Sequence, residues 1–443
     1  MGKNNLMELT GKVNPLKAFP FAIQQVLAMF VTNLTPLMLI AGMPVLEIPN
    51  DVYLALCQNA MTIAGIATLI QSTPIWKIGS GLPIFMGMSF TFVVPLCNIA
   101  VQYGYGAVMG TVIVGGVFEG LLGLSAKYLK KIIAPIVSAT VVTGIGLSLF
   151  GSAARSFGGG YATDFGAASY LVTGFVTMVA CILWQVLAKG TKKQLSILIG
   201  MVAGYITALC FGIVQFNDFS SIKIFALPKI LPYTPTFHFD AILTICIIYI
   251  VSATETMGDA TALAHGALHR NLAPGEISGA ITADGFCSSL GGVFGMPPVT
   301  SFSETIGLTI MTKVVNRNVA RIGALVLIVC GFFPPIGYFF TSIPTSVIGG
   351  VLIVVLGQIF VSGIQMIADA GFTTRNKLIA SISLAMGVGF TTATQSEIWV
   401  YMPELIKALF AENMVALIFV VSLILNLVLP KNMEFKPSGK EKN

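Results

Sequence analysis

Long apolar runs recur along the whole chain, and each strong run is long enough to cross a lipid bilayer. Hydrophobic residues make up 55% of the sequence and charged residues only 9%, whereas a soluble globular chain has about 25% charged residues. A run of about 20 apolar residues spans a hydrocarbon core roughly 30 Å thick as a helix. The sequence therefore predicts an all-α polytopic membrane protein.

We count about fourteen membrane-spanning segments. Twelve is the alternative count, because two Gly/Pro-rich segments need not cross the bilayer fully. The strong segments are residues 21–40, 111–124, 132–150, 170–187, 195–214, 242–251, 322–340, 347–361, 379–390 and 415–429. The weaker ones, diluted by Gly, Pro, Ser and Thr, are residues 55–70, 84–100, 277–294 and 299–311.

The basic residues predict the orientation of the chain. With fourteen spans and both termini in the cytoplasm, only Arg155, Lys223, Lys229 and Lys407 among the 24 Lys and Arg residues fall on the outer side. Cytoplasmic loops are enriched in Lys and Arg, so this bias accounts for the net charge of +6 without a nucleic-acid partner. We expect a multi-pass protein of the plasma (cytoplasmic) membrane.

Two irregular segments interrupt the third and tenth spans. Glycines and prolines precede a Ser-Phe-Ser/Thr sequence in both, at residues 89–91 and 301–303, about half the chain length apart. Because proline and glycine disfavour a helix, neither segment is expected to begin as one. We predict two short antiparallel strands that lead into half-helices, whose N-termini would face a solute. The alternative is a pair of proline-kinked helices without a ligand.

Four carboxylates lie in or beside these apolar segments. Glu255 and Asp259 are four residues apart and share a helix face, while Asp284 and Glu304 lie in the ninth and tenth spans. A carboxylate inside a membrane is costly and usually functional. Protonation of one of two adjacent carboxylates relieves their repulsion, so the pair suits a proton-coupled carrier. Glu119 lies near no irregular segment, and we expect a structural or interface role for it.

No other chemistry is indicated by the sequence. The seven cysteines and three histidines have no metal-ligand or disulfide spacing, and no nucleophile is paired with a base. We expect a transporter, not an enzyme, with no cofactor and no metal. The coupling ion is expected to be a proton, with Na⁺ as the alternative.

Residues 303–313 resemble the signature of the nucleobase–ascorbate transporters, also called the nucleobase–cation symporter-2 family. The chain matches this signature at Glu304, Gly307, Thr312 and Lys313, but has Thr305 where the family has Asn. Further similarity lies at residues 24–30, 89–92, 255–259 and 283–285.

The resemblance implies a fold of fourteen spans in two inverted repeats of seven, usually assembled as a homodimer. A core domain would comprise residues 1–126 and 237–341. A gate domain would comprise residues 127–236 and 342–443, the latter ending in a cytoplasmic tail. The family moves oxidised purines, uracil or ascorbate, in bacteria together with protons.

The resemblance also assigns residues to roles. Glu255 and Glu304 would hold the base, and Phe90 would pack on its ring. Backbone N–H groups near Thr91, Ser303 and Glu304 would meet its carbonyls, with one short strand around Phe90 and the other around Phe302. The further candidates are Phe302 and Gln25 for substrate binding and Glu255, Asp259 and Asp284 for proton coupling. We expect import of xanthine or urate by proton symport, with uracil as the alternative and an anion carrier as a weaker one.

Overall fold

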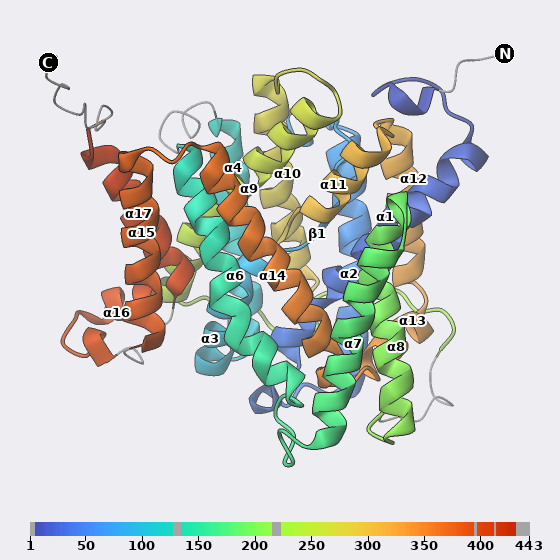
Figure 1. Cartoon of the computed structure of the whole chain (residues 1–443), viewed down its shortest axis with the longest axis horizontal. Coiled ribbons are helices and arrows are strands. Elements are labelled where there is room, and N and C mark those ends of the chain that lie inside the picture. The colour runs from blue at the N-terminus through green and yellow to red at the C-terminus, as the bar shows by residue number, and fades with distance from the viewer. Residues whose placement is uncertain (1–4, 127–133, 215–222, 394–396, 412, 431–443) are drawn as a thin grey trace, which may run out of the picture.

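The computed structural model describes residues 5–126, 134–214, 223–393, 397–411 and 413–430. The described chain is mostly helical, and its helices run alongside one another around a small central sheet (Figure 1). The helices of the first half are α1 (Pro15–Ala41), α2 (Asn50–Ser72), α3 (Val93–Tyr103), α4 (Tyr105–Leu124), α6 (Pro135–Phe157), α7 (Ala168–Leu187) and α8 (Ser196–Cys210). Those of the second half are α9 (Phe239–Gly266), α10 (Pro274–Val293), α11 (Ser303–Thr312), α12 (Arg317–Gly331), α13 (Pro334–Thr341), α14 (Thr345–Asp369), α15 (Thr374–Val388), α16 (Glu404–Phe410) and α17 (Met414–Val428).

The helices agree with the predicted membrane segments. Within the described residues, seven helices are long and apolar enough to cross a membrane, or eight if one bent pair forms a single span. The remaining predicted segments coincide with the 20-residue helix α10, with shorter helices or with a strand followed by a helix. A multi-pass membrane protein is therefore confirmed, whereas the count of fourteen stays a prediction. The predicted start of the fifth span at residue 132 and the predicted tail at 431–443 lie outside the described residues.

One predicted segment differs from the structure. Residues 322–340 were expected to form one continuous span, but α12 and α13 meet there at an angle of 78°. Two consecutive prolines, Pro334 and Pro335, begin α13. Proline has no N–H group and clashes with the preceding turn of a helix, so the helix cannot continue through this point.

The two predicted strands are present and antiparallel. Strand β1 (Met86–Met88) pairs with β2 (Val299–Ser301), with Gly87 opposite Thr300. Both strands end earlier than predicted, because Phe90 begins a 3₁₀ turn and Phe302 caps the N-terminus of α11. A side chain at Gly87 would come within 2.6 Å of the Phe302 ring and 2.8 Å of Asn33 Oδ1. Glycine is therefore needed at residue 87 for the Phe302 ring and the Asn33 side chain to pack against β1.

Small residues let several helices pack closely around the strands. Helix α4 packs on α10, and α2 packs on α12. At the first contact, a Cβ atom at Gly116 would lie 2.6 Å from the Gly285 carbonyl oxygen, and one at Gly285 would lie 2.6 Å from the Glu119 carbonyl carbon. Glycines that bring two helix backbones together are typical of membrane helix interfaces. This contact places residue 119 directly against the helix that carries Asp284.

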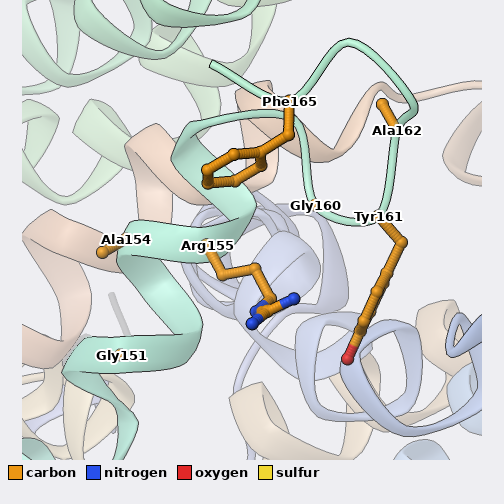
Figure 2. A pocket seen from close by; sticks show the side chains of 7 residues that line it. All are labelled: Gly151, Ala154, Arg155, Gly160, Tyr161, Ala162 and Phe165. Carbon is orange, nitrogen blue, oxygen red and sulfur yellow. The ribbon is translucent and has the colours of Figure 1, made fainter.

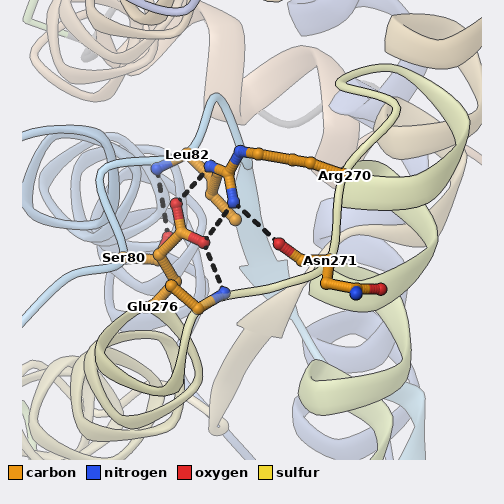
Figure 3. A network of polar contacts seen from close by, with 6 residues as sticks. Ser80, Leu82, Arg270, Asn271 and Glu276 are labelled. Carbon is orange, nitrogen blue, oxygen red and sulfur yellow. Dashed lines mark hydrogen bonds and ion pairs between the residues drawn. The ribbon is translucent and has the colours of Figure 1, made fainter.

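An ion pair fixes the connection between α9 and α10. Arg270 Nη1 lies 2.8 Å from Glu276 Oε2, and Glu276 also accepts from the backbone N–H of Ala273 at 2.9 Å (Figure 3). The hydrogen bond that Arg270 donates to Glu276 raises the pKa of the Arg270 guanidinium. In the adjoining segment, the Gly79 N–H donates to the Gly279 carbonyl at 2.9 Å. The segment before β1 is thus fastened to the start of α10.

Candidate functional site

Glu255 lies on α9 opposite the 3₁₀ turn that follows β1. The Thr91 hydroxyl donates to Glu255 Oε2 at 2.9 Å. Thr91 is buried, whereas Glu255 is only partly buried. The turn is stabilised locally by Ser89, whose hydroxyl accepts from the Thr91 N–H at 3.3 Å. Two residues predicted to bind substrate, Glu255 and Thr91, are therefore in contact.

Asp259 lies one turn further along α9 and contacts the second irregular segment. The Ser301 hydroxyl donates to Asp259 Oδ2 at 2.6 Å, and the Ser303 hydroxyl lies 2.9 Å from Oδ1. Ser301 ends β2 and is buried, while Ser303 begins α11 and is exposed. Asp259 thus joins α9 to the point where the strand changes into a helix.

Asp284 is the most deeply buried of the four predicted acids, with 0% of its surface exposed. Its Oδ2 atom accepts from the Thr256 hydroxyl on α9 and from the Thr300 hydroxyl on β2, the latter at 3.1 Å. The other oxygen, Oδ1, has no hydrogen-bond partner in the described part of the chain. Buried polar atoms normally have a hydrogen-bond partner. We therefore expect a proton or another donor group to bind this oxygen.

Glu304 lies in the first turn of α11, next to the other carboxylates. It is partly buried, and it interacts electrostatically with both Glu255 and Asp259. The N-terminus of a helix carries a partial positive charge that favours a carboxylate in the first turn. Two acids of the eighth predicted span, Glu255 and Asp259, and one of the tenth, Glu304, therefore lie near one another at the end of the paired strands.

The apolar and neutral candidates lie around this group of acids. Phe90 and Phe302 are 9% and 4% exposed, so both rings are buried, and the Phe302 ring packs against Gly87. Gln25, on α1, donates to the Thr309 hydroxyl on α11 at 2.9 Å, and its side-chain oxygen has no partner among the described residues.

Thr305, which replaces the signature Asn, is buried and bonds locally. Its hydroxyl donates to the Phe302 carbonyl at 2.7 Å, and its own carbonyl accepts from Thr309 at 2.9 Å. The Thr305 side chain therefore supports the first turn of α11. The side chain of threonine is shorter than that of asparagine, and α11 is continuous through this position.

Three groups at the site were missed by the sequence reasoning. The hydroxyls of Thr256 and Thr300 bind Asp284, and Glu119 lies on α4 against α10, next to Asp284. Glu119 was expected to be remote from the irregular segments, but the glycine contact between α4 and α10 brings it close. The signal that was available is the run of Gly115, Gly116 and Gly120 on both sides of this acid.

A separate cavity lies at one end of α6. It has a volume of about 550 Å³ and is lined by the exposed Arg155 and Tyr161, with the Arg155 guanidinium 5.3 Å from the Tyr161 ring centre (Figure 2). None of the predicted site residues lines this cavity. In the described part of the chain, no three His, Cys, Asp or Glu residues are arranged to hold a metal ion.

Comparison with known proteins shows the family of this chain. A family model described as "Permease family" and named for xanthine and uracil permeases matches residues 16–396. The xanthine permease XanQ of Escherichia coli K12 is 31% identical over 97% of this chain and 94% of its own length. A putative purine permease of Clostridium perfringens is 32% identical over 94% of this chain and 92% of its own length. The uric acid permease PucJ of Bacillus subtilis is 30% identical over 86% of each chain.

Solved structures show the same fold at low sequence identity. The membrane domain of the cyanobacterial bicarbonate transporter BicA superposes with a TM-score of 0.55, at 15% identity, over 95% of this chain and 100% of that one. The transporter SLC26A9 superposes with a TM-score of 0.61, at 12% identity, over 93% of this chain and 67% of that one. The family match covers most of the chain, and its members are transporters rather than enzymes. This chain belongs to the xanthine/uracil permease family, the nucleobase–ascorbate transporters.

Proposed function

We propose that the protein imports an oxidised purine base, xanthine or urate, by proton symport. The observation that carries this proposal is the meeting of Glu255, Asp259 and Glu304 at the ends of two paired, interrupted segments. The relatives named as xanthine, uric acid and purine permeases support the choice of substrate.

The chemistry of these bases fits the residues at the site. Xanthine and urate present alternating ring N–H donors and C=O acceptors along their edges. Carboxylates of Glu255 and Glu304 accept from N–H groups, and backbone N–H groups at the start of α11 donate to carbonyls. The Phe90 ring offers a face for a planar base. A base with the wrong edge would leave buried groups unpaired, at roughly 1–3 kcal/mol each.

Proton coupling would use the acids on α9 and α10. A proton loads onto the group around Glu255, the base binds, and the two together favour the transition that opens the site to the other side. Asp259 and Asp284 extend this group through their bonds to Ser301 and Thr300. We propose the proton as the coupling ion, without a cofactor. Uptake that follows a sodium gradient instead would replace this part of the proposal.

The proposed architecture has fourteen spans in two inverted repeats, with alternating access between a core and a gate domain. Matched helix packings support the repeats. If α2, α4, α7 and α8 of the first half are equivalent to α10, α12, α15 and α17 of the second, the packing of α4 on α10 is repeated by α12 on α2. The packing of α7 on α8 is likewise repeated by α15 on α17. The core would be residues 1–126 with 237–341, and the gate 127–236 with 342–443. We further propose a homodimer in the plasma membrane, with both termini in the cytoplasm as the Lys and Arg distribution predicts.

Uracil is the second candidate substrate. The observation that favours it is Glu304 at a position where the signature of the purine members more often has Gln. Although the two solved relatives include carriers titled for bicarbonate and anions, their likeness extends to the fold alone. A carboxylate at position 304 finds no N–H donor in bicarbonate or another inorganic anion and would repel its charge, so we propose a nucleobase over an inorganic anion as the substrate.

The test is uptake of radiolabelled xanthine, urate and uracil in cells that lack their own carriers, with and without a protonophore. We expect uptake of a purine that the protonophore abolishes and that excess uracil does not compete. Uptake of uracil alone would show that uracil, the second candidate, is the substrate instead of a purine. No uptake of any base would contradict the proposed substrate class.

A further inference from the structure

Glu119 is a buried acid whose bonding is incomplete. It is 0% exposed, and neither of its carboxylate oxygens has a hydrogen-bond partner in the described part of the chain. An ionised carboxylate in this setting loses its hydration without any compensating donor, which costs several kcal/mol. The simplest way to remove this cost is to keep a proton on the group.

The groups around Glu119 can accept and share that proton. Asp284 on α10 precedes Gly285, where a Cβ atom would lie 2.6 Å from the Glu119 carbonyl carbon. Both Asp284 and Glu255 on α9 interact electrostatically with Glu119. Asp284 Oδ1 and the Ser252 hydroxyl, which faces Glu119, are also buried without a partner among the described residues. The remaining titratable neighbour is Tyr249 on α9, whose hydroxyl donates to the Val112 carbonyl at 3.2 Å. Among the described residues, the groups that interact with Glu119 include no basic side chain.

The unfilled bonds of these groups complement one another. Asp284 already accepts two hydroxyl groups on Oδ2, as an ionised carboxylate does, but lacks a donor on Oδ1. A protonated Glu119 has one O–H donor and lacks an acceptor. One proton between the two carboxyl groups would satisfy both, and the Ser252 hydroxyl could donate to the second Glu119 oxygen.

A chain of hydrogen bonds leads from this pair to the exposed end of the site. Asp284 Oδ2 bonds the Thr256 hydroxyl, which accepts from Ser301 at 3.4 Å. Ser301 Oγ lies 2.6 Å from Asp259 Oδ2 and can accept from it when Asp259 is protonated, and Asp259 accepts from the exposed Ser303 hydroxyl. Hydroxyl groups can both accept and donate a proton. Protons could therefore pass along this chain without any other co-reactant.

We propose that Glu119 is a proton-holding residue of the transporter, which shares one proton with Asp284 at the buried end of this hydrogen-bonded chain. In each cycle the O–H bond of Glu119 breaks as a new one forms on Asp284, leaving Glu119 as the carboxylate, and reprotonation reverses the step. This assignment rests on the proposed proton symport. It gives α4 a part in coupling although no residue of α4 was predicted to bind the base.

The test combines infrared spectroscopy with transport, using Glu119→Gln in the full-length protein. Glutamine has the same shape and can still donate to Asp284, but it cannot exchange a proton. We expect Glu119→Gln to lose the C=O band of a buried protonated carboxyl group. It should also lose accumulation of base against a gradient while keeping exchange of labelled for unlabelled base. Thr111→Val is the matched control, because Thr111 is a buried polar residue of α4 that bonds only its own helix; it should resemble wild type.

Each result has a definite meaning. An unchanged infrared band in Glu119→Gln would show that Glu119 is ionised and overturn the proposal. A lost band with wild-type accumulation would also overturn it, since the proton would then be purely structural. The infrared measurement needs no substrate, so it judges the proton site even if the protein moves none of the tested bases.

A second variant covers the case in which Glu119→Gln does not fold. In Asp284→Asn the acceptor is an amide rather than a carboxylate, so the Glu119 carboxyl band should remain but move to a higher frequency as its hydrogen bond weakens. A band that does not move would contradict the shared proton.

Discussion

The two paired strands are equally buried, yet their surroundings differ in chemistry. Strand β1 is held by neutral groups: the Met88 N–H donates to Asn33 Oδ1 and the Met86 N–H to the Thr68 hydroxyl, both at 2.9 Å. Strand β2 is held by Ser288, which bonds both the N–H and the C=O of Val299 at 3.0 Å. In addition, the Thr300 and Ser301 side chains on β2 bind the carboxylates of Asp284 and Asp259.

This difference indicates that the surroundings of β1 stabilise the fold, whereas those of β2 can take part in proton transfer. Around β1, amide and hydroxyl groups satisfy the backbone without adding charge, so that side of the sheet is a stable frame. Around β2, carboxylates are fastened by short hydroxyl side chains whose protons can move. We therefore expect changes near β1 to alter stability and changes near β2 to alter coupling.

The largest effect is expected for Glu255→Gln, on α9 one turn before Asp259. Removing the charge should abolish accumulation of base driven by a proton gradient. Binding of the base is either retained or lost together with accumulation. Uptake with an imposed pH gradient, together with thermal stabilisation by base, measures the two properties separately. Full proton-driven accumulation by this variant would remove Glu255 from the coupling mechanism. Glu276→Gln, which alters an acid of the α9–α10 connection, is the control.

Glu304→Gln is expected to change which base is preferred. An amide has both a donor and an acceptor, so it matches a different edge of the base than a carboxylate does. Competition of unlabelled xanthine, urate and uracil against one labelled base gives the order of preference. An unchanged order with a uniform loss of transport would show that Glu304 serves structure or coupling rather than selection.

On the neutral side, Asn33→Ala should destabilise the protein and leave coupling intact. The buried Met88 N–H loses its acceptor, which costs roughly 1–3 kcal/mol. The melting temperature of purified protein should fall, while the ratio of protons to base moved by the folded fraction stays at the wild-type value. Thr35→Ala, which removes a hydroxyl that bonds only Val31 of its own helix, is the matched control. A changed proton ratio in Asn33→Ala would break the division between the two sides.

The smallest effect is expected from the ion pair of Arg270 and Glu276. It lies in the connection between α9 and α10 and is partly exposed, at 38% and 17% of the two side chains. Exposed ion pairs contribute about 0–1 kcal/mol, so Arg270→Ala should lower the melting temperature slightly and less so at high salt. Transport and base preference should not change. A large loss of uptake would show that this connection takes part in the transport cycle.

The sequence predicted the helical membrane class, the two strands and the family. These follow from apolar runs, from glycine and proline before residues 89 and 301, and from the motif at Glu304, all of which are local. It also placed Glu255, Asp259 and Glu304 near one another. In the structure Glu255 and Asp259 both interact electrostatically with Glu304, and the roles of these residues stay predictions.

Features that depend on packing between distant helices were not predictable. The position of Glu119 against Asp284 depends on how closely α4 and α10 approach, which is set by glycines on both helices. The bonds of Thr256 and Thr300 to Asp284 depend on the register of β2 against α9. The bend between α12 and α13 was visible as a proline pair, but apolar periodicity alone favoured one continuous span.

The most direct test is a count of protons moved with xanthine in proteoliposomes that contain the purified protein, with Glu255→Gln measured alongside. Wild-type protein should take up protons in a fixed ratio to xanthine and accumulate the base until a protonophore is added, and Glu255→Gln should do neither. Equilibration of xanthine without proton movement, or coupling that survives in Glu255→Gln, would contradict the assignment of proton coupling to the carboxylates on α9.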